Sequence, residues 1–312
     1  MGKKSMPKYT IRGVVNMLND LSILIIGGDN RYVEVMKELA QEGATVYIAG
    51  YDTLTEDVDA LHTNLKDVNF SKLDALLLPV SGTNSEGEVE LAPFSKTKLK
   101  LTEKMIKQTK KDCTIYTGVS NNFLDAIAER TDRELIPLFT RDDMAILNSI
   151  PTAEGTLALA MEETDTMIHG SNVLVLGFGR VGLTAAKLFA SVGAQVGVSA
   201  RKAADLARIK EMGLKPIHVN KIEQEAAKHD ILINTIPSLI VDKNVLSSVP
   251  TSSLIIDLAS APGGVDFEVA KEKGIKAIHA LGLPGKVAPK SAGKIIADVL
   301  IELLKEDNTS FN

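Results

Sequence analysis

The stretch Val173-Leu174-Val175-Leu176-Gly177-Phe178-Gly179-Arg180-Val181-Gly182 decides the fold of this chain. Its first four residues are apolar and predict a buried strand, and three glycines follow in the spacing G-x-G-x-x-G. The residues after it, Leu183 to Val192, have the apolar period of a helix. This order of strand, glycines and helix is the context in which the spacing predicts a dinucleotide-binding turn.

Each glycine of the turn has its own predicted task. Gly177 permits a sharp turn, Gly179 lets the backbone approach a diphosphate, and Gly182 lets the helix pack on the strand. The free N–H groups at the helix start would face the phosphates, and Arg180 would add a charge-assisted contact. The predicted cofactor-binding residues of the turn are Gly177, Phe178, Gly179, Arg180, Val181 and Gly182. The alternative is a glycine-rich turn without a ligand.

The end of the next predicted strand, Ala194 to Val198, selects the dinucleotide. NAD enzymes usually place an Asp or Glu there, which binds the ribose hydroxyls. Ser199-Ala200-Arg201-Lys202 instead offers a hydroxyl and two cations and no acid that would repel a 2′-phosphate. The sequence therefore predicts NADP, held by Ser199, Arg201 and Lys202. The alternative is that the two cations only cap the following helix.

Length and composition exclude several classes of protein. A chain of 312 residues predicts about two domains, and its net charge of -5 argues against nucleic acid as the main partner. No apolar run approaches the roughly 18 residues of a membrane span. The one cysteine, Cys113, is predicted to be buried rather than nucleophilic, and the five histidines are scattered. We therefore expect a cytoplasmic protein without a metal site.

The first half of the chain repeats the strand, turn and helix plan in a weaker form. Leu21 to Ile26 predicts a strand, Gly27-Gly28-Asp29-Asn30-Arg31 a turn, and Thr45 to Ala49 the next strand after a helix. The third glycine is missing, so we interpret this half as flavodoxin-like and no longer able to hold a dinucleotide. The turn with Arg31 is predicted to bind a small anion; the alternative is a solvated arginine.

Polar clusters follow three later strands of the first half. Ligands of open parallel sheets bind outside the carboxyl ends of the strands, so Ser81, Ser120 and Arg141 are candidate ligands of a substrate. The alternative is ordinary turn chemistry, which favours the same residue types.

The second half supplies the remaining site candidates. Thr235-Ile236-Pro237 and Leu258-Ala259 end two predicted strands, where the nicotinamide half of the cofactor would lie. Lys286 is a further candidate for the substrate. His279, near a strand end, and Glu154, if it faces the cleft, are the candidates for a catalytic base.

The predicted fold class is therefore α/β, with two doubly wound domains. An N-terminal flavodoxin-like half and a C-terminal NAD(P)-binding Rossmann half are joined by a long helix, at whose end His169 is predicted as a cap. The predicted boundaries are a disordered extension (1–16), a substrate-side domain (17–150), a linking helix (151–169), the Rossmann domain (170–288), and a C-terminal helix and tail (289–312).

The two-domain plan resembles the group of 2-hydroxyacid dehydrogenases and S-adenosylhomocysteine hydrolase. More specifically, five motifs in this order resemble the family of the dipicolinate synthase A subunit, over about Met17 to Leu304. The motifs are Gly27-Gly28-Asp29-x-Arg31, Leu78-Pro79-Val80-Ser81, Arg141-Asp142-Asp143-x-Ala145-Ile146-x-Asn148-Ser149-Ile150-Pro151-Thr152-x-Glu154-Gly155, Asn234-Thr235-Ile236-Pro237-Ser238 and Gly282-Leu283-Pro284-Gly285-x-Val287-Ala288-Pro289.

The resemblance implies a reaction and a partner. The family is associated with sporulation and with conversion of dihydrodipicolinate, or its hydrated precursor, to pyridine-2,6-dicarboxylate, with a flavoprotein-like second subunit. The substrate is a dianion, so we expect Arg31, Arg141 and Lys286 to bind its carboxylates, with Ser81 and Ser120 as hydroxyl partners. We also expect a homo-oligomer in the mother-cell cytoplasm.

Two other functions remain open from the sequence. One is a non-catalytic, NADP-binding regulatory subunit of a flavoprotein partner. The other is a 2-hydroxyacid dehydrogenase, a group that relies on an arginine in the Rossmann half and a Glu–His pair. Ser260-Ala261-Pro262-Gly263-Gly264 has no arginine at the corresponding position, which counts against this second alternative.

Overall fold

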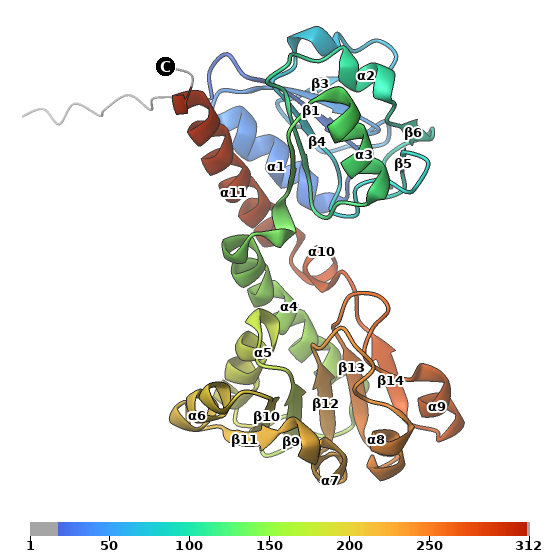
Figure 1. Ribbon diagram of the computed structural model, residues 1–312, viewed down its shortest axis with the longest axis vertical. Coiled ribbons are helices and arrows are strands. Elements are labelled where there is room, and N and C mark those ends of the chain that lie inside the picture. The colour runs from blue at the N-terminus through green and yellow to red at the C-terminus, as the bar shows by residue number, and fades with distance from the viewer. Residues whose placement is uncertain (1–17, 311–312) are drawn as a thin grey trace, which may run out of the picture. The chain divides into compact units, whose positions relative to one another are not determined.

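The computed structural model describes residues 18–310, and the predicted extension 1–16 lies outside these residues (Figure 1). Residues 18–28, 35–136 and 297–310 form a first compact unit, and residues 29–34 and 137–296 form a second. Within residues 18–310, none of the helices combines the length and the apolar character that crossing a bilayer requires.

The first unit is built on a six-stranded sheet in the order β3-β2-β1-β4-β7-β8. The recorded pairings between its strands are parallel. Without the short outer strand β3, the order becomes 2-1-3-4-5 along the chain, which is the flavodoxin order. The strands are β1 (Ser22–Ile26), β2 (Thr45–Ala49), β3 (Leu61–His62), β4 (Ala75–Leu77), β7 (Thr114–Thr117) and β8 (Leu135–Pro137). Its helices include α2 (Glu103–Lys107) and α3 (Asn122–Thr131), and α1 (Asn30–Gln41) belongs to the first unit from Val35 onward.

A two-stranded hairpin closes the glycine turn after β1. Its strands β5 (Glu88–Val89) and β6 (Leu99–Lys100) are antiparallel. The N–H of Gly28 donates to the carbonyl of Leu91 at 2.7 Å, and that of Gly27 donates to Ala49 at 2.9 Å. A Cβ at Gly27 would lie 2.7 Å from Cγ1 of Val89. The chain itself therefore uses the N–H donors of both glycines, so the small anion expected at this turn stays a prediction that rests on Arg31.

The second unit contains a six-stranded sheet in the order β11-β10-β9-β12-β13-β14, and its pairings are parallel. This 3-2-1-4-5-6 order along the chain is that of dinucleotide-binding domains, as the sequence predicts. The strands are β9 (Asn172–Leu176), β10 (Gln195–Ala200), β11 (Lys215–His218), β12 (Ile231–Asn234), β13 (Leu254–Asp257) and β14 (Lys276–His279). The connecting helices are α5 (Arg180–Ser191), α6 (Ala203–Glu211), α7 (Ile222–Ala226), α8 (Lys243–Ser248) and α9 (Phe267–Glu272).

Both predicted boundaries of the linking helix are wrong. The long helix α4 (Asp142–Glu163) begins well before Pro151 and ends at the C-cap Thr164. His169 is therefore not its cap; it packs against Gly193, where a Cβ would overlap its ring. The segment around Lys286 forms α10 (Leu283–Val287) ahead of α11 (Pro289–Ser310).

Candidate cofactor-binding site

The three glycines after β9 meet different surroundings. Gly177 has a φ of +102°, which an L side chain rarely adopts, and a Cβ on Gly182 would overlap with the carbonyl oxygen of Gly177. Gly179 differs from both, because its φ of -83° suits any residue and its Cβ position has no protein atom within 4 Å. The fold itself therefore needs Gly177 and Gly182, whereas Gly179 borders open space.

The first turn of α5 presents hydrogen-bond donors to this space. Gly179 is the N-cap and gives no side-chain cap, so the first N–H groups of the helix have no partner within it. Such a helix start is a ready site for a diphosphate. Arg180 lies in this turn, and its Nη1 contacts Oδ1 of Asp142 at 2.6 Å. Its guanidinium keeps further donors for a second contact.

Two cavities meet at the glycine turn, and both lie within the second unit. One has a volume of about 450 Å³ and the other of about 390 Å³, in the range of small-molecule sites. The first is lined by Gly177, Phe178, Gly179, Ser199, Ala200, Arg201, Asp205, Val219, Ile236, Ser238 and Ile240. The second is lined by Phe139, Ala145, Asn148, Gly177, Phe178, Gly179, Arg180, Val181, Thr235, Ile236 and Pro237. A dinucleotide that crosses the turn would fill both.

The end of β10 lines the first cavity. Ser199 is fully buried, and its Oγ accepts a hydrogen bond from Gly177 N–H at 3.3 Å, so this hydroxyl holds the turn. Arg201 and Lys202 are exposed, and neither side chain has a recorded partner among residues 18–310. Asp205, in the first turn of α6, also lines the cavity and was missed by the sequence reasoning. The sequence did contain a signal for Asp205, because it is an acidic residue about one helical turn beyond the strand end at which NAD enzymes carry theirs.

A buried carboxyl group holds together the loops after β12 and β13. Asp257 has no exposed surface. Its Oδ1 accepts hydrogen bonds from Asn234 Nδ2 at 2.8 Å and Ala259 N at 3.1 Å, and its Oδ2 accepts one from Gly264 N at 2.8 Å. Asn234 also binds the backbone of Ile236. Asp257 thus fixes the loop that lines both cavities, and the sequence reasoning missed this role.

The two candidates for a catalytic base lie outside both cavity linings. His279 pairs in register with Asp257 across β13 and β14. Its Nε2 lies 2.9 Å from the carbonyl oxygen of Ala259, so Nε2 donates to that oxygen. Glu154 is exposed on α4. Ala259 and Leu258, predicted at the cofactor, also line neither cavity.

The candidate cations for the substrate have different surroundings. Arg31 is 7 % exposed and binds Asp29 through Nε at 2.9 Å and Nη2 at 2.8 Å. Gly285 of α10 lies over this pair, because its Cβ would be 3.0 Å from Arg31 Nε. The neighbouring Lys286 is exposed.

Arg141 binds Asp143, with 2.7 Å between Nη2 and Oδ2, and this hydrogen bond is the main reason that the pKa of Asp143 lies below its usual value.

The hydroxyl candidates belong to the first unit. Ser81 is exposed, and Ser120 donates to Oδ1 of Asp125 at 2.5 Å. A cavity of about 340 Å³ lies at the carboxyl ends of β2 and β3, and neither serine lines it.

Metal and thiol chemistry find no support in residues 18–310. No three His, Cys, Asp or Glu side chains there gather as metal ligands. Cys113 is buried, as predicted, and burial raises the pKa of its thiol to about 11. A thiol with so high a pKa is a poor nucleophile at neutral pH.

Comparisons with known proteins agree with this architecture. The family model of the N-terminal domain of the dipicolinate synthase A subunit matches residues 22–139, and that of the alanine dehydrogenase/PNT C-terminal domain matches residues 145–310. The chain is 48% identical over 291 residues to the dipicolinate synthase A subunit of Bacillus subtilis (strain 168), covering 93% of this chain and 98% of that protein.

Solved structures show the same relationship. The crystal structure of the dipicolinate synthase A subunit from Bacillus halodurans matches with a TM-score of 0.90 at 48% identity, covering 92% of this chain and 99% of that chain. The corresponding crystal structure from Bacillus subtilis matches with a TM-score of 0.89 at 47% identity, covering 95% and 99%. A transhydrogenase from Sinorhizobium meliloti, at 18% identity and a TM-score of 0.65, shares the fold and covers 91% and 93%. The second unit is therefore a nicotinamide-dinucleotide-binding domain, and the chain belongs to the family of the dipicolinate synthase A subunit.

Proposed function

We propose that this protein is an NADP-dependent oxidoreductase that converts dihydrodipicolinate, or its hydrated precursor, to pyridine-2,6-dicarboxylate. The observation that carries the proposal is the open space at Gly179, at the start of α5 and between two cavities. The names of the relatives supply the product, dipicolinate, and the second unit supplies the class of cofactor. We extend the proposal to a homo-oligomer that acts during sporulation in the mother-cell cytoplasm with a flavoprotein-like second subunit.

The residues of the second unit fit the cofactor. The N–H groups of the α5 first turn and Arg180 would hold the diphosphate, and Arg201 and Lys202 would hold a 2′-phosphate. Thr235, Ile236 and Pro237 line the cavity on the other side of the turn, which suits the nicotinamide. Bound in its oxidised form, NADP supplies a hydride acceptor.

The remaining chemistry is orientation and proton removal. A dihydropyridine that loses a hydride and a proton becomes an aromatic pyridine, so the chain needs to position the substrate and accept one proton. We assign the carboxylates of the substrate to Arg31, Arg141 and Lys286; Ser81 and Ser120 stay predictions for the same role. Nδ1 of His279 is our candidate for the proton acceptor, because the carbonyl of Ala259 fixes the ring. Glu154 is the second candidate.

Formation of NADPH in a single turnover tests the function. The purified chain is mixed with NADP and with dihydrodipicolinate generated in place, with and without the second subunit. We expect the absorbance of reduced nicotinamide to appear. One equivalent of pyridine-2,6-dicarboxylate should form per equivalent of NADPH. Cofactor binding without turnover, even with the second subunit present, would instead identify a regulatory NADP-binding subunit.

The choice of NADP over NAD depends on the two exposed cations. Arg201→Ala combined with Lys202→Ala is expected to weaken NADPH binding about 30-fold, because two charge-assisted contacts are lost. NADH binding should change less than about two-fold on the same grounds. Titration of both cofactors by fluorescence measures this, with Lys210→Ala in the following helix α6 as control. Tighter NADH than NADPH binding by the unchanged protein would refute the choice, and Asp205 would then explain it as a ribose ligand.

The substrate assignment depends on the arginines. Arg141→Ala and Arg31→Ala are each expected to raise the KM for dihydrodipicolinate about ten-fold, since each removes a charge-assisted contact, and to leave the Kd of NADP unchanged. Steady-state kinetics measures this, with Arg208→Ala, which removes an exposed pair with Glu211, as control. Arg31→Ala also leaves Asp29 without its recorded partner, so its unfolding is measured alongside. Unchanged KM and kcat in both variants would show that the substrate binds elsewhere.

A further inference from the structure

Residues 96–111 of the first unit carry an unusual excess of lysines. The segment has seven lysines and one acid, Glu103, in a chain whose net charge is -5. Surfaces of soluble proteins usually intersperse both signs, so an excess of one sign points to a partner. We call the exposed lysines of this segment the basic surface: Lys96, Lys98, Lys100, Lys104, Lys107 and Lys111.

Most of this charge is not used inside the protein. The side chains of Lys96, Lys100, Lys104 and Lys111 have no recorded hydrogen bond or ion pair within residues 18–310. Lys98 is 84% exposed and reaches Glu88 only at 3.4 Å. In β6, the buried Leu99 separates Lys98 from Lys100, so these two lysines share the opposite face of the strand. In α2, Lys104 and Lys107 are three residues apart and therefore share one face of the helix.

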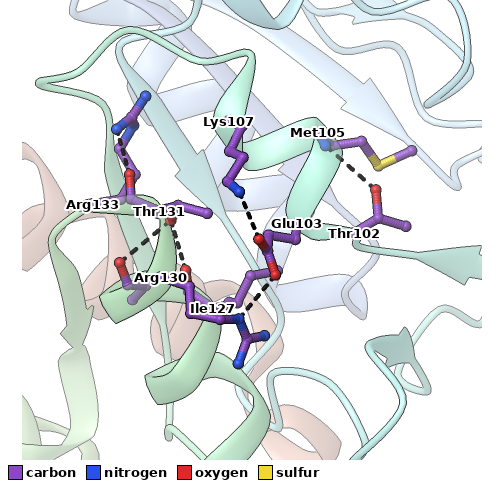
Figure 2. A network of polar contacts seen from close by, with 9 residues as sticks. Thr102, Glu103, Met105, Lys107, Ile127, Arg130, Thr131 and Arg133 are labelled. Atoms are coloured by element: carbon purple, nitrogen blue, oxygen red, sulfur yellow. Dashed lines mark hydrogen bonds and ion pairs between the residues drawn. The ribbon is translucent and has the colours of Figure 1, made fainter.

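Polar contacts connect the segment to α3, as Figure 2 shows. Glu103 contacts Lys107 at 2.8 Å and Arg130 of α3 at 2.9 Å, so it ties α2 to α3. These hydrogen bonds, first from Lys107 and then from Arg130, keep the pKa of Glu103 below its usual value.

The loop after α2 is fixed as well. Arg133 donates from Nε to Thr109 Oγ1 at 3.0 Å and from Nη2 to the Thr109 carbonyl at 2.9 Å. The single acid of the segment is therefore engaged by Lys107 and Arg130, and Lys96, Lys100, Lys104 and Lys111 keep no ion pair among residues 18–310. Because these contacts hold the backbone of the segment, a partner would need to order mainly the lysine side chains.

We propose that the basic surface docks an acidic face of the second subunit of the synthase. Charge complementarity of this kind steers two proteins together and raises the rate of association. Nucleic acid fits less well, because residues 96–111 contain neither the arginines nor the aromatic side chains that read or stack bases. The inference rests on the proposed function for the identity of the partner, but it concerns association and not turnover.

Charge reversal on the full chain tests the proposal. Lys96→Glu, Lys100→Glu, Lys104→Glu and Lys111→Glu are combined, and association with the purified second subunit is followed by stopped flow between low and physiological salt. We expect the association rate constant to fall at least about ten-fold at low salt, and its dependence on salt to flatten. The matched control combines Lys221→Glu, Lys243→Glu, Lys271→Glu and Lys273→Glu in the second unit, which changes the net charge equally and should alter the rate less than about two-fold.

Three results would overturn the proposal. Equal slowing by both sets of substitutions would show an effect of net charge alone. An unchanged rate, or no association of the unaltered chain, would show that this surface does not dock the second protein. Lysine-dependent binding of an RNA or DNA oligonucleotide, with an unchanged rate of protein association, would assign the surface to nucleic acid. NADP binding is measured in every variant as a check of folding. If the two proteins associate but no turnover occurs, the proposed function is refuted and the docking proposal is not.

Discussion

A Gly179→Val variant is expected to fold as the unaltered chain does and to bind NADP at least about 100-fold more weakly. The backbone at Gly179 has a φ of -83°, which valine accepts, and its Cβ position faces open space. The added Cβ would therefore meet no protein atom within 4 Å, and the side chain would occupy the approach of the diphosphate to the α5 start. A 100-fold loss corresponds to about 3 kcal/mol of binding free energy. Isothermal titration and thermal unfolding of the same sample measure both quantities.

Gly182→Ala is the matched control, because it tests a glycine of the same turn with the opposite expectation. A Cβ on Gly182 would overlap the carbonyl oxygen of Gly177, which is backbone and cannot rotate away. We expect a loss of about 1–3 kcal/mol in the free energy of unfolding, typical of overpacking. If Gly179→Val bound NADP as tightly as the unaltered chain, the diphosphate would not lie at this turn, and the assignment of the cofactor site to it would be wrong.

The second large effect is expected at Asp257. Asp257→Ala should lower the free energy of unfolding by about 4 kcal/mol, because Asn234 Nδ2 and the N–H groups of Ala259 and Gly264 lose their acceptor in a fully buried place. The loop of Ile236 that lines both cavities should loosen as well, so NADP binding should also weaken. Urea unfolding followed by circular dichroism measures the stability.

Two control variants distinguish the loss of stability caused by breaking the Asp257 network from the loss caused by removing a carboxylate elsewhere. Asp242→Ala removes an N-cap of α8 and should cost only about 1 kcal/mol. Asp257→Asn keeps one acceptor but points an amide N–H at the N–H of Gly264, so an intermediate loss is expected. A loss below about 1 kcal/mol in Asp257→Ala would mean that water or relaxed neighbours replace the carboxylate.

Local patterns in the sequence predicted the sheets and the glycine turn because their causes are local. Apolar runs mark buried strands, and the spacing of Gly177, Gly179 and Gly182 reflects backbone conformation and close packing within one turn. The family resemblance was carried by short motifs of the same kind and is confirmed. The cation pair Arg201 and Lys202 follows β10 directly, so its exposure could also be anticipated.

What the sequence could not show depends on contacts between distant residues. The hairpin residue Leu91 reaches Gly28 across the first unit, and Gly264 reaches back to Asp257 through a loop whose path no local pattern defines. The start of α4 was missed for a different reason. Proline favours the first turn of a helix, so Pro151 suggested a start, whereas here it lies inside the helix and Asp142 begins it.

The hairpin over the first glycine turn has a consequence for stoichiometry. Both sheets are parallel and doubly wound, and each places a glycine turn at the end of its first strand. Among the described residues, the turn at Gly27 is filled by Val89 and Leu91, and the turn at Gly179 remains open. Within residues 18–310, each chain therefore offers one open glycine turn, so an assembly of these chains would offer as many such turns as it has copies of the chain.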